Sequence, residues 1–270
     1  IKTDVELKLG LADLHNAEPD QIALLDLYKE MEFKTWVEEA TAAINNPHSF
    51  ESSSVTEAVT DAPDSEISAP KEPRNTDYQI ILTVAEFTVW LEKIKTAPLV
   101  AVDTETTSLN YMRADLVGIS VATESYQAAY IPFGHDYLGA PEQLSKDYVL
   151  ENIKPLLENK NIKKVGQNLK YDMSVLAQHG IDLQGIAFDT MLESYVLDSV
   201  ATRHDMDSLA LKYLEQTTTG FTDIAGKGAS QLTFNHIALE EAGPYAAEDA
   251  DITLRLHQTL WPQLTTEPTL

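Results

Sequence analysis

The sequence contains no cysteine, which excludes disulfide bonds, a thiolate nucleophile and cysteine-ligated zinc. It also lacks any apolar run near the roughly 20 residues that span a bilayer, and no signal-peptide pattern opens it. We therefore expect a cytoplasmic protein with no membrane partner. The first residue is Ile1 rather than Met, so we also expect a piece of a longer protein.

Basic residues are scarce as well: 19 Lys and Arg stand against 43 Asp and Glu, for a net charge of −24. This balance disfavours a protein that holds nucleic acid over a broad basic surface. It does not exclude an enzyme that meets phosphates through divalent cations, because clustered carboxylates are the ligands such cations require. The position of the acidic residues along the chain therefore decides between the two.

The chain divides into three parts by composition. Residues 1–46 contain apolar residues at helical spacing, which predicts a short helical tail too small to fold well alone. Residues 47–76 are rich in Pro, Ser and acidic residues and almost free of large apolar side chains, which predicts a disordered linker. Residues 77–270 carry the pattern of a folded α/β domain.

Within that domain short apolar runs alternate with amphipathic segments, which predicts a small mixed sheet with helices on both faces. Three closely spaced strands should pair antiparallel, and a fourth that follows a helix should be parallel. The predicted strands are Tyr78–Thr83, Leu99–Asp103, Leu116–Ala122, Ala128–Phe133 and Ile162–Val165. The predicted helices are Val84–Lys95, Leu169–His179, Thr190–Ser199, Met206–Leu214 and Pro244–Leu260.

Two carboxylates, Asp103 and Glu105, come where the buried strand ends. Residues i and i+2 of a strand share one face, about 6–7 Å apart, and two unpaired carboxylates there repel each other unless a cation compensates. No Lys or Arg follows before Arg113. The pair therefore indicates metal ligands, although alone it is equally compatible with an acidic strand end in a solvated turn.

Two further acidic motifs lie on predicted helices. Asn168 and Asp172 are four residues apart at a helix start, with Asn168 as a potential N-cap, and alone they suggest an ordinary capped surface turn. Tyr245 and Asp249 have the same spacing on the last helix, which alone suggests an acidic amphipathic helix. We expect Glu248 and Asp251, on other faces of that helix, to be solvated.

Together the three motifs, in this order, resemble those of the DnaQ-like 3′→5′ exonucleases, which have an RNase H-like fold. Five segments also resemble the proofreading exonuclease domain of the bacterial DNA polymerase I family, and the likeness covers about Tyr78 to Leu264. These segments are Val102–Thr106, Val165–Asp172, Phe188–Tyr195, Arg203–Leu209 and Tyr245–Asp251.

The resemblance implies two divalent cations, Mg²⁺ or Mn²⁺, with zinc less expected. Asp103, Glu105 and Asp249 would hold the first ion, and Asp103 would be shared with a second ion held by Asp172, partly through water. Tyr245 would orient the attacking water. The implied reaction is removal of nucleoside 5′-monophosphates from single-stranded or frayed DNA 3′ ends.

The resemblance also implies substrate contacts and flanking domains. Leu109 and Phe221 would wedge against the terminal bases, or alternatively pack in the core. A polymerase domain would follow this chain, and the segment around Leu25–Trp36 looks like the end of a 5′-nuclease domain. The positions expected near phosphates and sugars are Gln167, Asn168, Tyr171 and Arg203, with His204, Lys163, Lys164 and Lys170 as further possibilities.

Two other functions stay open at this point. The first is an RNA-trimming 3′→5′ exoribonuclease with the same fold and ions, which would have to accommodate a terminal 2′-hydroxyl group. The second is a catalytically silent domain that supports a polymerase. The intact carboxylates and the tyrosine argue against the silent domain, because a scaffold has no need to keep repelling charges together.

Overall fold

The structure is a computed structural model, and the chain divides into two units, Ile1–Ser68 and Ala69–Leu270. In the first unit, the carboxylate of Asp20 accepts hydrogen bonds from two N–H groups at the start of helix α1 (Gln21–Glu30). The helix falls within the predicted helical tail, whereas the predicted linker, except Thr76, lies outside the described residues. The described residues are 20–31, 33, 36–37, 40–41, 44, 76–200 and 203–267.

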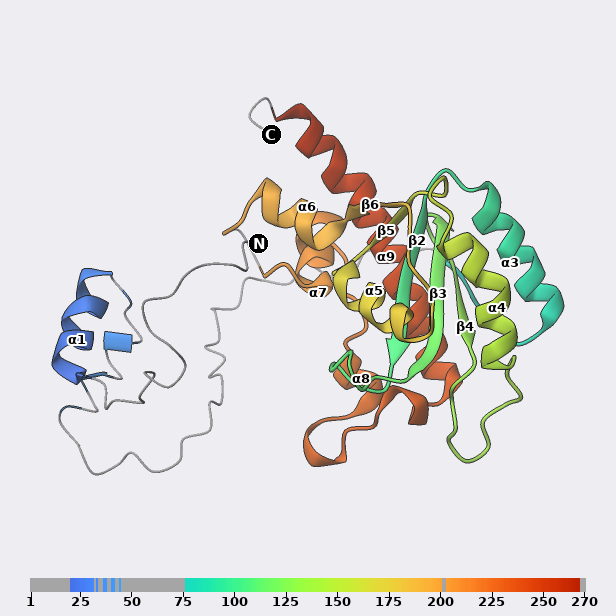
Figure 1. Ribbon diagram of the computed structural model, residues 1–270, viewed down its shortest axis with the longest axis horizontal. Coiled ribbons are helices and arrows are strands. Elements are labelled where there is room, and N and C mark those ends of the chain that lie inside the picture. The colour runs from blue at the N-terminus through green and yellow to red at the C-terminus, as the bar shows by residue number, and fades with distance from the viewer. Residues whose placement is uncertain are drawn as a thin grey trace, which may run out of the picture. The chain divides into compact units, whose positions relative to one another are not determined.

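The second unit is built on a six-stranded mixed sheet with the strand order β1-β4-β3-β2-β5-β6 (Figure 1). The neighbouring strands β4, β3 and β2 pair antiparallel, while β1 joins β4, β5 joins β2 and β6 joins β5 in parallel. This arrangement confirms the predicted α/β class. The strands are β1 (Asp77–Ile80), β2 (Val100–Thr106), β3 (Leu116–Glu124), β4 (Gln127–Pro132), β5 (Lys164–Gly166) and β6 (Ile186–Asp189).

Helices connect and cover the strands, and no helix in the described part of the chain is long and apolar enough to cross a membrane. The longer helices are α3 (Val84–Thr96), α4 (Lys146–Leu157), α5 (Leu169–Gln178), α6 (Thr190–Leu197) and α9 (Leu239–Thr266). The short ones are α7 (Met206–Leu209), the π-turn η2 (Ala210–Leu214), α8 (Phe221–Ala225), η3 (Gly228–Ser230) and η4 (Phe234–His236).

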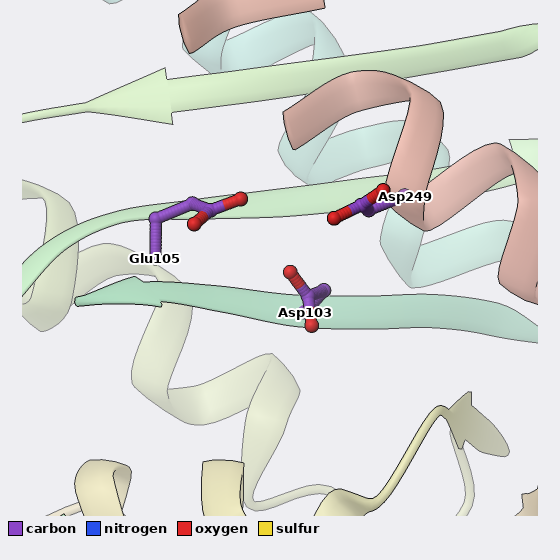
Figure 2. A group of neighbouring side chains, drawn as sticks. All are labelled: Asp103, Glu105 and Asp249. Carbon is purple, nitrogen blue, oxygen red and sulfur yellow. The ribbon is translucent and has the colours of Figure 1, made fainter. Parts of the chain in front are cut away.

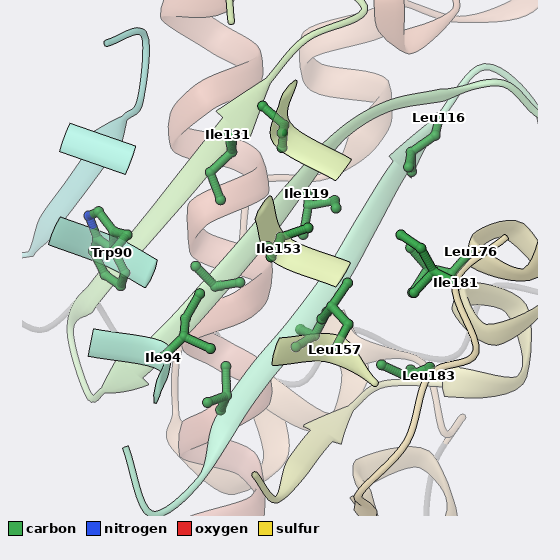
Figure 3. Packing of buried hydrophobic residues seen from close by; sticks show 14 of the residues in the cluster. Trp90, Ile94, Leu116, Ile119, Ile131, Ile153, Leu157, Leu176, Ile181 and Leu183 are labelled. Carbon is green, nitrogen blue, oxygen red and sulfur yellow. The ribbon is translucent and has the colours of Figure 1, made fainter. Parts of the chain in front are cut away.

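One face of the sheet is packed with large aliphatic side chains (Figure 3). Helix α3 begins with a capping box between Thr83 and Glu86 and turns Phe87, Trp90 and Ile94 toward the sheet at a spacing of three and four residues. Helices α4 and α5 complete this layer. Because most inward positions are filled by branched or aromatic side chains, this face is a packed hydrophobic core.

The other face is lined with small residues, which lets α9 lie close to the strands. Ala101, Ala122 and Ala128 from three adjacent strands pack against Ala247 and Ala250 of α9. A side chain at Gly243 of α9 would be driven into Ile80 of β1, since an added Cβ would lie 2.4 Å from it. The close approach of α9 positions its polar residues over the middle of the sheet.

Several elements differ from their sequence-based predictions in extent or type. Strand β6 was not predicted, because Ile186–Asp189 is an edge strand of exposed or half-buried side chains whose apolar run is too short to indicate a buried strand. The segment Met206–Leu214 is helical over its predicted length, but only its first part, α7, is α-helical and the rest, η2, is π-helical. Helix α9 begins five residues before Pro244, so a proline that was expected to start the helix lies inside it.

Candidate active site

Strand β2 carries two carboxylates on the face that α9 covers. The side chains of Asp103 and Glu105 share one side of the strand (Figure 2). Thr104, between them, points to the other side by the alternation of a β-strand. The strand was predicted to end at Asp103, but pairing with β3 extends it to Thr106. Both carboxylates are therefore held by a rigid, hydrogen-bonded strand.

Helix α9 adds the third carboxylate, Asp249, which points toward Asp103 and Glu105 across the gap between helix and sheet (Figure 2). One oxygen from each of the three groups lies within 4.8 Å of the others. Glu105 is buried, and the two aspartates are half-buried. Residues almost 150 positions apart in the sequence thus form one compact acidic cluster.

The fourth predicted carboxylate, Asp172, lies on α5 in its first turn and is only 2% exposed. Its Oδ1 atom accepts hydrogen bonds from the backbone N–H of Thr104, at 3.1 Å, and from the Thr104 hydroxyl, at 2.5 Å. It stands outside the group of three but near enough to Asp103 for the two charges to interact. The structure therefore places Asp172 beside the acidic cluster and anchors it to β2.

Burial raises the pKa of all four carboxyl groups. The pKa of Asp103 rises from 3.8 to about 7 because the group loses water. The pKa values of Glu105, Asp172 and Asp249 rise well above their ordinary range, first through burial and then through repulsion from Asp103 and other acidic neighbours. In the absence of a compensating cation the cluster retains protons near neutral pH.

The protein itself offers no such cation. Among the described residues, none of these four carboxylates has a Lys, Arg or His partner within ion-pair distance. The Oε1 atom of Glu105 is buried and has no hydrogen-bond partner within the described part of the chain. An orphaned carboxylate oxygen beside two further carboxylates fits a hard divalent cation, for which oxygen atoms are the preferred ligands.

Tyr245 lies one turn before Asp249 on α9, with its phenol close enough to the Asp249 carboxylate for the two groups to interact. Burial, followed by the charges of Asp249 and Glu105, raises the pKa of Tyr245. The phenol therefore stays protonated and serves as a hydrogen-bond donor at the edge of the acidic cluster. Its predicted position beside the carboxylates is consistent with this geometry.

The two residues predicted to contact bases have different environments. Leu109 is 95% exposed in the loop that follows β2. Phe221, at the start of α8, is half-buried, with ring centroids 6.3 Å from Tyr245 and 6.4 Å from Phe234. An exposed leucine has no packing role, so the alternative of core packing does not apply to Leu109, whereas it partly applies to Phe221.

Gln167 and Tyr171 use their polar groups within the protein. The Gln167 side chain donates to the backbone carbonyl of His204 at 2.8 Å and accepts from the Thr190 hydroxyl. The Tyr171 hydroxyl donates to the carbonyl of Ser108, in the loop that carries Leu109. Both side chains hold loops beside the site, and their contact with a substrate stays a prediction.

Asn168 and Arg203 are exposed. Asn168 precedes α5 in the left-handed conformation, with φ 60° and ψ 44°, and its side chain makes no capping hydrogen bond. Asn168 therefore occupies the predicted N-cap position, but its side chain does not cap the helix, and no residue that the structure describes hydrogen-bonds its side-chain amide. Arg203 likewise presents its guanidinium group to solvent, so both remain predicted substrate contacts.

The predicted patch of positive charge is smaller than expected. Lys163 and Lys170 are exposed, but Lys164 is fully buried and donates a hydrogen bond to the carbonyl of Asn159 at 2.7 Å. Burial lowers the pKa of Lys164 to about 8. Alternation along β5 turns this side chain inward, so Lys164 is not available to a phosphate. The His204 ring is hydrogen-bonded to Ser194 at 2.9 Å.

The prediction that Glu248 and Asp251 are solvated is also wrong. Asp251 is 0% exposed and accepts hydrogen bonds from the Tyr78 hydroxyl, at 2.8 Å, and from Arg255, at 3.1 Å. Glu248 is half-buried and accepts from the backbone N–H of Thr219 at 2.9 Å. These two acids fix α9 to its surroundings and lie outside the acidic cluster.

Two residues that position the site were not among the predictions, Thr104 and Asp189. Thr104 binds Asp172, as described above. The Asp189 carboxylate accepts hydrogen bonds from backbone N–H groups at the starts of two helices: from Leu169 of α5, at 2.8 Å, and from Met191 of α6, at 3.0 Å. The sequence Asp189-Thr190 before a helix is a capping signal for α6, but no sequence signal indicates the contact with α5.

Clustered, desolvated carboxylates without a protein counter-charge, set on a mixed sheet under a long helix, define a class: a nuclease whose acidic cluster suits metal ions. A model of the 3′-5′ exonuclease family matches residues 78–265. The chain belongs to this 3′→5′ exonuclease family. The match confirms the resemblance inferred from the motifs, including the exonuclease function.

Related proteins with assigned names support this family membership. Over its full length the chain is 52% identical to DNA polymerase I of Pseudomonas aeruginosa, of which it covers 28%. Over 70% of its length it is 40% identical to DNA polymerase I of Rhizobium leguminosarum, of which it covers 20%. The chain thus spans less than a third of the length of these relatives.

Solved structures share the fold at low sequence identity. Trypanosoma brucei RNase D in complex with RNA U12 has a TM-score of 0.55 at 16% identity, over 68% of this chain and 62% of that one. Brucella melitensis NrnC has a TM-score of 0.52 at 20% identity, over 71% and 82% of the two chains. These matches confirm the predicted RNase H-like architecture.

Proposed function

We propose that this domain removes nucleoside 5′-monophosphates from single-stranded or frayed DNA 3′ ends with the help of two divalent cations, as in proofreading. The observation that carries the proposal is the acidic cluster, in which three carboxylate oxygens lie within 4.8 Å of one another and the buried Glu105 Oε1 has no partner among the described residues. Such an arrangement is costly in a structural domain and useful in one that binds cations.

Asp103, Glu105 and Asp249 would hold one ion, and Asp172, together with Asp103, would hold the second. When bound, the two ions supply charge neutralisation for the attacking and departing oxygens of a phosphodiester. Mg²⁺ and Mn²⁺ suit this set of oxygen ligands, and a site without cysteine or histidine is a poor match for zinc. The carboxylates of the protein hold the ions in place, and no side chain of the cluster has to act as a general base.

Tyr245 would orient the attacking water. Its phenol lies beside the Asp249 carboxylate, at the edge of the acidic cluster. Because the pKa of Tyr245 is raised, the group retains its proton and cannot itself be the base at neutral pH. In this environment Tyr245 can act only as a neutral phenol that positions the water through a hydrogen bond.

Leu109 and Phe221 would separate the terminal bases from a duplex. A largely exposed leucine can pack on the face of any base, and the half-buried Phe221 offers an aromatic ring next to Tyr245. Such contacts tolerate every base, with roughly 1–3 kcal/mol for each stacked base. Sequence-independent removal of nucleotides follows from contacts of this kind.

The domain arrangement and the partners also belong to this proposal. Residues 1–46 would be the end of a 5′-nuclease domain, 47–76 a linker and 77–270 the exonuclease domain of a DNA polymerase I-type protein. The support is the identity of 52% to a curated DNA polymerase I along the whole chain. A polymerase domain would accompany this one in the full protein and would supply the DNA end.

The choice of DNA over RNA is tested by one competition experiment. A 3′-labelled DNA strand and an RNA strand of the same sequence are incubated with the domain and Mg²⁺, and the release of mononucleotides is followed for each. We expect release from DNA to be faster, together with the order single strand, mismatched end, matched duplex, because a paired end must melt first. Faster release from RNA would support the exoribonuclease alternative, and no release from either would support the silent scaffold.

A further inference from the structure

The side chain between the two β2 ligands, Thr104, faces away from the cluster and is 6% exposed. The parallel pairing of β2 with β5 reaches only as far as Ala101 and Val165. Beyond that point no strand among the described residues pairs with this edge of β2, and the backbone N–H of Thr104 donates to the Asp172 carboxylate instead. The start of α5 is therefore joined to β2 by a side chain at the position where backbone pairing has ended.

Both hydrogen bonds from Thr104 end on the same oxygen, Oδ1 of Asp172, at 3.1 Å from the backbone nitrogen and 2.5 Å from the hydroxyl oxygen. Two donors on one atom, both from a residue of a paired strand, hold that carboxylate oxygen in place and restrict rotation of the group. With Asp172 only 2% exposed, water cannot easily replace either donor. The orientation of Asp172 is thus set by β2, the strand that also carries Asp103 and Glu105.

We propose that Thr104 is a positioning residue for the second cation: its hydroxyl orients the Asp172 carboxylate and thereby sets the affinity for that ion. This inference rests on the proposed function, in which Asp172 holds the second ion. Groups that hydrogen-bond a metal ligand typically change metal affinity by about 10- to 100-fold when they are removed. Strand β2 would then serve both ions: Asp103 and Glu105 on one face bind metal directly, and Thr104 on the other face positions Asp172.

The test compares three variants of the chain. Thr104→Val keeps the branched shape and the backbone N–H but removes the hydroxyl, whereas Thr104→Ser keeps the hydroxyl. Thr253→Val is the matched control, because Thr253 is a threonine 1% exposed whose hydroxyl has no partner among the described residues. Binding of Mn²⁺ is measured by electron paramagnetic resonance with a deoxynucleoside 5′-monophosphate present, and thermal unfolding is recorded in chelator.

We expect Thr104→Val to weaken the binding of one Mn²⁺ ion about 10-fold or more and to leave the other within about 3-fold. Thr104→Ser and Thr253→Val should bind both ions like the native chain. In an Asp172→Asn background the Thr104→Val change should have no further effect on Mn²⁺ affinity, because Thr104 acts through Asp172. If Thr104→Val fails to fold, Thr104→Ala replaces it with the same expected affinities.

Native-like binding of both ions by Thr104→Val would overturn the inference, as would an equal loss for both ions or an additive loss in the Asp172→Asn background. The mononucleotide release described above, measured on the native chain, keeps the two proposals apart. Absence of Mg²⁺-dependent release by the native chain contradicts the proposed function. Release by the native chain together with unaltered ion binding in Thr104→Val contradicts only the role of Thr104.

Discussion

Glu105→Gln should make the metal-free domain more stable while it removes activity. In the native chain the buried Oε1 atom of Glu105 has no donor among the described residues, and Asp103 and Asp249 lie within 4.8 Å. Glutamine has nearly the same shape but no charge, and its amide can donate a hydrogen bond to a neighbouring carboxylate. The substitution therefore replaces two repulsions by an attraction.

The size of the effect follows from the geometry of the cluster. Two unit charges 4.8 Å apart repel each other by about 3.5 kcal/mol at an effective dielectric constant of about 20. Because burial keeps part of the cluster protonated, the free energy of unfolding at pH 8 should rise by a fraction of this, about 1–3 kcal/mol. The melting temperature should rise by roughly 2–4 °C for each kcal/mol.

The assay is thermal unfolding of the native chain and the variant at pH 8, in chelator and in saturating Mg²⁺. Glu105→Gln should melt higher than the native chain in chelator, gain less from Mg²⁺ and release mononucleotides at less than about 1% of the native rate. Glu248→Gln is the control, since Glu248 is engaged by the Thr219 N–H and should not gain stability. A variant that melts lower than the native chain in chelator would refute the repulsion argument.

Further predictions concern pH, the tyrosine and the exposed leucine. Burial raises the pKa of Asp103 from 3.8 to about 7. The folded, metal-free domain therefore binds more protons than the unfolded chain in this range, and its free energy of unfolding should fall as pH rises from 3.8 through about 7. Mg²⁺ should restore the lost stability at pH 8. A melting temperature in chelator that rises across this pH range contradicts the prediction. Tyr245→Phe should bind metal normally but slow single-turnover cleavage by about 100-fold or less, and an unchanged rate would remove Tyr245 from the mechanism. Leu109→Ala should change stability by less than about 0.5 kcal/mol yet raise KM for single-stranded DNA about 10-fold, so an unchanged KM argues against the wedge.

Most of the fold could be predicted from the sequence because its central strands are buried on both faces and read as short apolar runs. The strands around Val102 and Ile119 and the helix with Phe87, Trp90 and Ile94 have the expected periodicity and the expected position. Strand β6 lacked this signal, since its side chains lie at the edge of the sheet. An edge strand forms because it pairs with a neighbouring strand, and the periodicity of its own sequence does not reveal that pairing.

Part of the acidic site could also be predicted, because the strand that carries it was recognised. Alternation along a strand places Asp103 and Glu105 on one face whatever the rest of the chain does. The resemblance to known exonucleases supplied Asp172 and Asp249, which local pattern alone left open. Their actual distances depend on the small residues under α9 and on the hydroxyl of Thr104, which are contacts between residues far apart in the sequence.

The errors at charged residues have a common physical cause. Lys164 and Asp251 were expected at the surface because charged side chains are seldom buried without partners. Each is fully buried with partners that the sequence does not reveal: the carbonyl of Asn159 for the lysine, and Tyr78 and Arg255 for the aspartate. Burial of a charge depends on such three-dimensional partners, so composition and spacing predict it poorly.

The most direct test of the two-cation exonuclease site is the release of mononucleotides from a 3′-labelled DNA single strand by the native chain and by Asp103→Asn. The native chain should release labelled nucleoside 5′-monophosphate in Mg²⁺ and none in chelator. Asp103→Asn, which removes the carboxylate proposed to serve both ions while keeping its size, should release none in either solution. Cleavage by the native chain in chelator, or substantial Mg²⁺-dependent cleavage by Asp103→Asn, would contradict the account.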